Sequence, residues 1–173
     1  MLKTSLKWGG YCGVLLVVII VSGDYLMNGS SSDNFGSSEV FGYVTFVACL
    51  GMIYLAFNEV ARSGAVKSET IWQKIMLGVA ISAVAGLIFG FYNVIYTSYI
   101  NPSFLDDYYN YYIAQLPVQS GPKYDAMVAS LEAEKQMFMQ PLTQFFVMST
   151  TVLAVGIPES VILAVIHKKL AKT

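Results

Sequence analysis

Glu159 is an ionisable side chain set inside a long apolar stretch, residues 142–166. In a helix it would lie roughly 10 Å inside the end of that stretch. A carboxylate is costly there and often marks a path for ions or protons. The preceding Pro158 would interrupt the helical hydrogen bonding and free a backbone carbonyl. The functional hypothesis is coupling to ion or proton movement. The structural alternative is that Glu159 pairs with Lys74 or Arg62, or reaches the inner membrane interface.

Two asparagines could complete an intramembrane polar site with Glu159. Asn93 lies in the apolar stretch 71–98, and Asn58 lies close to the end of the stretch 40–61. An amide can line a polar path, but it can also join two helices by a hydrogen bond, which contributes about 0.6 kcal/mol on average in a membrane. Both interpretations stay open for these residues.

A tyrosine cluster follows two aspartates in the segment after residue 102. Its members are Tyr108, Tyr109, Tyr111 and Tyr112. Such rings could form a surface for a sugar, a lipid headgroup or a protein partner. The alternative is an aromatic belt at the membrane interface, which needs no ligand.

The residue types needed for catalysis or cofactor binding do not come together in this sequence. Its one histidine, His167, lies near the C-terminal end, and no phosphate-binding glycine loop is present. Met137 and Met139 have the Met-x-Met spacing of copper sites but no further soft ligand nearby. We therefore predict a protein that is not an enzyme and that has no metal or cofactor.

The composition indicates that these residues are carried by membrane helices. Of 173 residues, 55% are hydrophobic and only 12% are charged, with a mean hydropathy of +0.58. A helix needs about 20 apolar residues to cross the hydrocarbon core. Four stretches qualify, at about residues 8–27, 40–61, 71–98 and 142–166. The fold class predicted is an all-α membrane protein with residues 1–173 in a single integral membrane domain.

The segments between these stretches differ in character. Residues 28–39, NGSSSDNFGSSE, are rich in glycine and serine and predict a loop. Residues 102–140 contain apolar positions at intervals of three and four and a break at Pro117, Gly121 and Pro122. This pattern predicts an outer helical hairpin between the third and fourth transmembrane helices.

Small residues recur every four positions along the third stretch: Gly78, Ser82, Gly86 and Gly90. Positions four apart lie on one helix face, so these residues predict a groove in which a neighbouring helix can approach closely. The partner helix could belong to the same chain or to another.

The distribution of basic residues predicts the orientation. Eight of them fall on one side of a four-pass arrangement: Lys3, Lys7, Arg62, Lys67, Lys74, Lys168, Lys169 and Lys172. Only Lys123 and Lys135 fall on the other side. Both termini should therefore be cytoplasmic and the hairpin periplasmic. The sequence has no basic stripe with interleaved aromatic residues, so it does not indicate nucleic-acid binding.

Four segments carry a resemblance to a known family. They are KWGGYCG over 7–13, the turn over 62–70, YTSYINPSFLDD over 96–107, and HKKL over 167–170. Together they resemble an uncharacterised family of bacterial four-span inner-membrane proteins, a domain of unknown function. The resemblance implies the topology and the bacterial inner membrane, and it implies no functional residue.

These observations favour two functions over a third, an enzyme acting on membrane lipids. The first is a non-enzymatic scaffold or accessory subunit of a membrane complex, which binds a protein partner or a second copy through its helix faces and the outer hairpin. The alternative is a small carrier of ions or amphiphilic molecules that uses Glu159 and Asn93. The position of Glu159 discriminates between them, because a carrier should place it in a cavity with Asn93 or Asn58.

Overall fold

The computed structural model describes residues 1–26, 35–63 and 70–170, and these residues are almost entirely helical. Four helical segments are long and apolar enough to cross a membrane. They are helix α1 (Leu2–Leu26), α2 with α3 (Phe35–Leu50 and Ile53–Ser63), α4 with a π-helical end η1 (Ile71–Ile95 and Tyr96–Ile100), and α7 (Pro141–Leu170). The all-α fold and the four apolar helices predicted from the composition are confirmed.

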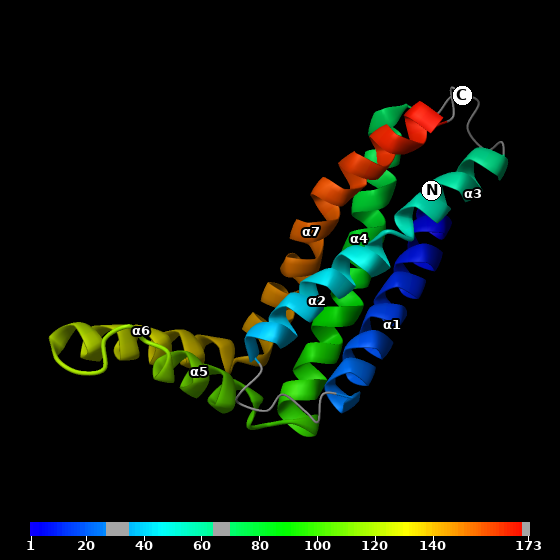
Figure 1. Cartoon of the computed structure of the whole chain (residues 1–173). Coiled ribbons are helices and arrows are strands. Elements are labelled where there is room, and N and C mark those ends of the chain that lie inside the picture. Colours follow the sequence, from blue (N-terminus) through cyan, green and yellow to red (C-terminus); the bar gives the residue numbers. More distant parts are fainter. Residues whose placement is uncertain (27–34, 64–69, 171–173) are drawn as a thin grey trace.

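Helix α4 is the central element of the bundle. It packs along both α1 and α7, and these three helices run side by side in Figure 1. Its N-terminus is closed by a capping box, in which the Thr70 hydroxyl accepts from the Gln73 backbone N–H and the Gln73 side chain accepts from the Thr70 N–H. The buried core lies along α4 and includes Leu77, Ile81 and Ala85.

The small residues of α4 lie against α7 of the same chain. A Cβ built on Gly86 would lie 2.6 Å from the carbonyl oxygen of Ser149, and one on Gly78 would lie 2.7 Å from the Cβ of Ser160. Ser82 in turn occupies the space that a Cβ on Gly156 would need. The two helices therefore approach closely, and this face is already occupied within the chain.

The second apolar segment departs from its prediction in two ways. Helix α2 begins at Phe35, so residues 35–39, predicted to be loop, are helical; the rest of the predicted loop that precedes them lies largely outside the described residues. The expected single helix over 40–61 is interrupted at Gly51 and Met52, where α2 ends and α3 begins. Glycine weakens a helix, and the backbone N–H of Met52 donates instead to the carbonyl of Cys49, three residues back, at 3.2 Å.

Two further helices, α5 (Phe104–Ala114) and α6 (Pro122–Phe138), form an arm that projects sideways from one end of the bundle (Figure 1). We call this end the arm end, and the opposite end, where α1 begins and α7 finishes, the terminal end. The segment between α5 and α6 ends at Gly121, whose φ of 92° suits glycine. Pro122 follows in the first turn of α6. An ion pair between Lys135 and Asp106 joins the two arm helices.

Candidate functional site

The three polar residues predicted to form one intramembrane site lie in three different places. Asn93 lines a cavity at the arm end, whereas Asn58 lines a cavity at the terminal end. Glu159 lines neither of these cavities. Its Oε2 is buried with no hydrogen-bond partner among the described residues, and its Oε1 lies near the helix break, 3.8 Å from where a Cβ on Gly51 would stand.

The arm-end cavity has the larger volume of the two and is lined by more residues. It has a volume of about 640 Å³ and lies between the bundle and the arm, with lining residues from α1, α2, α4, α5, α6 and α7. A ligand pocket of this kind typically encloses about 300–1,000 Å³. Of its 23 lining residues, six are phenylalanines and six are tyrosines: Phe35, Phe41, Phe46, Phe89, Phe104, Phe138, Tyr43, Tyr92, Tyr96, Tyr108, Tyr109 and Tyr112. We call it the aromatic cavity.

Carboxylates are fixed at the wall of the aromatic cavity by tyrosine hydroxyls. Tyr108 and Tyr112 both donate to Oε1 of Glu39, at 2.8 and 2.7 Å. Tyr96 donates to Oδ2 of Asp24 at 3.0 Å. These bonds connect residues about 70 positions apart in the chain, so they attach the arm and α4 to the first two helices.

The carboxylates also change the acidity of the arm tyrosines. Burial, followed by the hydrogen bond to Glu39, raises the pKa of Tyr108 above its ordinary value. For Tyr112, the hydrogen bond to Glu39 is the larger cause of a raised pKa, and burial is the second. Burial and the neighbouring Glu134 charge raise the pKa of Tyr109 to about 12. All three phenols therefore stay protonated and able to donate at neutral pH.

Three of the four clustered tyrosines line the aromatic cavity, and the fourth packs against one of its lining residues. Tyr108, Tyr109 and Tyr112 line the aromatic cavity, whereas Tyr111 does not. The Tyr111 ring packs on Phe35, with ring centroids 5.4 Å apart. Phe35 is only 2% exposed and also contacts Phe104 and Tyr108.

Sequence reasoning missed Phe35, Glu39 and Asp24 as members of the site. Phe35 and Glu39 lie in a segment whose serines and glycines indicate a loop, and Asp24 follows the apolar part of the first helix. The only local signal was a single aromatic residue inside an otherwise small and polar stretch.

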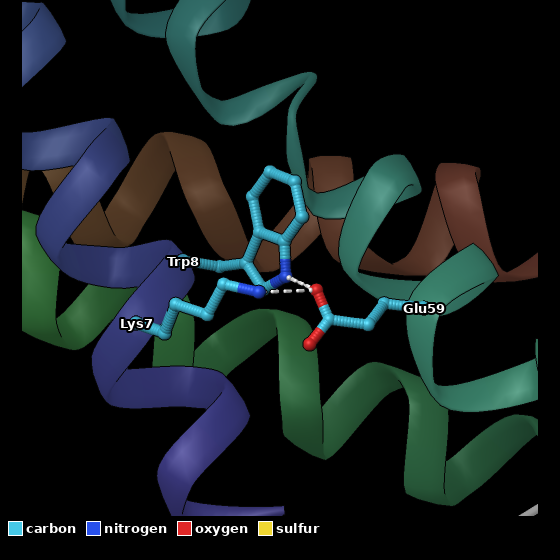
Figure 2. A network of polar contacts seen from close by, with 3 residues as sticks. All are labelled: Lys7, Trp8 and Glu59. Carbon is cyan, nitrogen blue, oxygen red and sulfur yellow. Dashed lines mark hydrogen bonds and ion pairs between the residues drawn. The ribbon is translucent and has the colours of Figure 1, made fainter. Parts of the chain in front are cut away.

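The terminal end carries a separate polar network, shown in Figure 2. Oε2 of Glu59 in α3 accepts from Lys7 Nζ and from Trp8 Nε1 of α1, both at 2.8 Å. Beside it is a cavity of about 530 Å³ lined by six residues, among them Asn58 and Arg62. The network ties the beginning of α1 to the end of α3, which is a structural role.

Two buried basic side chains meet nearby. Lys74 Nζ lies 2.6 Å from His167 Nδ1, which joins α4 to α7. The imidazole packs edge to face on Tyr54 and Phe57 of α3. Lys74, one of the basic residues suggested as a partner for Glu159, is therefore engaged at the end of α7.

Metal-binding geometry is absent from the described residues, where no group of three His, Cys, Asp or Glu side chains comes together. Cys12 and Cys49 are both buried free thiols, and Cys12 Sγ contacts the Cys49 carbonyl oxygen at 3.4 Å.

Comparison with known proteins places the chain in a family. A family model described as a protein of unknown function, DUF4199, matches residues 7–169. The chain belongs to the DUF4199 family. No curated protein and no solved structure matches this DUF4199 protein significantly. The expected resemblance to a domain of unknown function is confirmed, and the four apolar helices of this DUF4199 member are those of a multi-pass membrane protein.

Proposed function

We propose that this protein binds a small amphiphilic molecule in the aromatic cavity, in the manner of a carrier or receptor within the membrane. One observation carries the proposal: the cavity of about 640 Å³ lies between the transmembrane bundle and the arm, and combines apolar rings with a few fixed polar groups. Pockets that bind small molecules have this makeup. Asn93 and Glu39 would orient the polar end of the ligand.

The carrier hypothesis no longer rests on Glu159, because this residue was expected to share a cavity with Asn93 or Asn58 and lines neither of the two cavities. Asn93 belongs to the proposed site, but Glu159 does not line it. Glu159 lies beside the break between α2 and α3. Its buried Oε2 has no hydrogen-bond partner among the described residues, and its Oε1 lies near Gly51 at the break. Broken helices and buried acids are recurrent elements of transporters, but Glu159 does not line the aromatic cavity, so the proposal gives it no contact with the ligand.

The proposed setting is the bacterial inner membrane, with the terminal end cytoplasmic and the arm periplasmic. The terminal end carries Lys3, Lys7, Arg62, Lys74, Lys168 and Lys169, and the arm carries Lys123 and Lys135. This asymmetry supports the orientation through the positive-inside rule. The arm would then lie along the outer membrane surface and cover the mouth of the cavity.

A second candidate, an accessory subunit, is favoured by one observation on α6. None of the residues of this helix is buried. A partner protein could therefore bind along it. The small-residue face of α4 does not support this function, because α7 occupies it. Gentle purification followed by mass measurement tests this candidate: a companion protein should dissociate when α6 is altered, and a strict monomer contradicts it.

The binding proposal is tested by filling the cavity. Gly42 lines it, and a Cβ there would meet no atom within 4 Å, so the side chain of Gly42→Leu starts in open space and should reduce the volume of the cavity. The matched control is Gly10→Leu, whose site is equally open but lies outside the cavity. Both variants are placed in nanodiscs of zwitterionic lipid with decanol carrying a photoreactive diazirine.

Mass spectrometry then maps the labelled peptides. Labelling of α2 and α5 in the unaltered protein should be lost in Gly42→Leu and kept in Gly10→Leu. Labelling spread evenly over the lipid-facing helices, and equal in all three proteins, would refute binding in the cavity.

A further inference from the structure

The charge on the cavity wall identifies the class of ligand. Asp24, Glu39 and Glu134 line the aromatic cavity, and no lysine, arginine or histidine is among its lining residues in the described part of the chain. The nearest arm lysine in sequence, Lys135, forms an ion pair with Asp106, which is not a lining residue. Among its described lining residues, the cavity wall therefore has three acidic side chains and no basic one.

Glu39 is placed to receive a positive group. Its two tyrosine donors, Tyr108 and Tyr112, both bind the same oxygen, Oε1. No described residue is hydrogen-bonded to the other oxygen, Oε2. The two phenols hold the orientation of the carboxylate while one oxygen stays available to a ligand.

The rings around Glu39 suit a cation that donates no hydrogen bonds. Tyr108 and Tyr112 have ring centroids 4.8 Å apart, and Phe104 stacks on Tyr108 at 6.2 Å. The face of an aromatic ring attracts cations, and groups of such rings recognise quaternary ammonium ligands. On the bundle side of the cavity, Phe46 of α2 and Phe89 of α4 offer an apolar surface to a hydrocarbon tail.

We propose that the ligand is an amphiphilic cation, with its positive head between Glu39 and the arm tyrosines and its apolar part among the rings of α2 and α4. This inference rests on the proposed binding function and specifies its ligand. Anionic amphiphiles should be excluded, because their head would meet three carboxylates in a partly desolvated site. Neutral ones should bind more weakly, through the tail alone.

The test uses three decyl probes that carry the same diazirine and differ only in the head: trimethylammonium, hydroxyl and carboxylate. Each is photolysed with the unaltered protein in nanodiscs of zwitterionic lipid, and labelling of α2 and α5 is normalised to the Gly42→Leu variant. This normalisation removes the difference in how the probes enter the bilayer. The trimethylammonium probe should reach half-maximal labelling at a concentration about tenfold below that of the hydroxyl probe.

A conservative variant locates the effect. Glu39→Gln removes the charge but keeps an oxygen that can accept from both phenols, so the arm should stay docked. It should abolish the preference for the trimethylammonium head, so that the trimethylammonium and hydroxyl probes reach half-maximal labelling at the same concentration. Glu132→Gln is the matched control, because it removes one charge from an exposed arm position outside the cavity and should change neither value.

The outcomes separate the two proposals. If all three heads label the cavity equally, or the carboxylate labels best, the cation inference is wrong while binding in the cavity stands. If none labels the cavity above the Gly42→Leu background, the binding function itself is wrong. If Glu39→Gln also loses the hydroxyl probe, the order of the three heads in the unaltered protein decides the inference.

Discussion

The Gly86→Ala variant tests the contact between α4 and α7 most directly. The new Cβ would lie 2.6 Å from the Ser149 carbonyl oxygen and 3.4 Å from its carbonyl carbon. Both are backbone atoms, so the clash is relieved only if one helix moves away from the other. Overpacking of this kind typically costs about 1–3 kcal/mol. Because no side chain can rotate out of the way, we expect the upper value, about 3 kcal/mol, which is roughly a 150-fold change in the unfolding equilibrium.

Gly78→Ala is a useful comparison, because the atoms that obstruct its Cβ most closely belong to a side chain. A Cβ on Gly78 would clash with the side chain of Ser160, whose Cβ would be 2.7 Å away. Ser160→Gly removes those atoms and leaves Ile53 Cγ2 at 3.1 Å, so it should restore most of the stability that Gly78→Ala loses in a double-mutant cycle. Ser149→Gly should not rescue Gly86→Ala, because the obstructing oxygen belongs to the backbone.

The assay is reversible unfolding in mixed detergent micelles, followed by far-ultraviolet circular dichroism. Gly10→Ala is the control, since a Cβ there meets nothing within 4 Å, and its stability should not fall. The reasoning is refuted if Gly86→Ala is as stable as Gly10→Ala. It is equally refuted if Gly86→Ala leaves the monomer intact and separates an oligomer, since the partner helix would then belong to another copy.

Two further predictions concern the arm. Tyr108, Tyr109 and Tyr112 hold their protons more tightly when docked than at their ordinary pKa of 10.0, so docking is fully stabilised below pH 10 and weakens as pH rises above it. Spin-label distances between α2 and α5 should lengthen in this range together with phenolate absorbance; distances that stay constant up to pH 12, the value near which Tyr109 titrates, contradict the assignment. For orientation, a membrane-impermeant maleimide applied to intact cells should label Lys123→Cys and leave Lys168→Cys unlabelled, and the reverse pattern would overturn the proposed topology.

Much of the fold was predictable because it depends on local properties of the chain. Apolar stretches long enough to cross a bilayer must satisfy their own backbone hydrogen bonds, so helices are the outcome. Pro122 and Pro141 likewise begin helices at the first turn, where proline costs least. These features follow from residues close together in sequence.

The candidate site was harder to predict, because its residues come from distant parts of the chain. Glu39 meets Tyr108 across 69 positions, and neither residue has a pattern that points to the other. The polar residues that did stand out, Glu159, Asn93 and Asn58, entered three different environments. Asn93 and Asn58 lie at opposite ends of the bundle, so no rotation of their helices could bring them together. The neighbours of Glu159 depend on how α7 packs, which hydropathy does not specify.

The sequence alone determined that this protein has four apolar helices. It also determined that one face of α4 has side chains small enough for a neighbouring helix to pack closely. Gly78, Gly86 and Gly90 define that face because they are small and share a helical repeat. Only the tertiary structure decided that α7 covers it and that Phe35 and Glu39 close a cavity under the arm. The physical reason is that helix formation depends on neighbours a few residues away, whereas the meeting of two faces depends on how all the helices pack together.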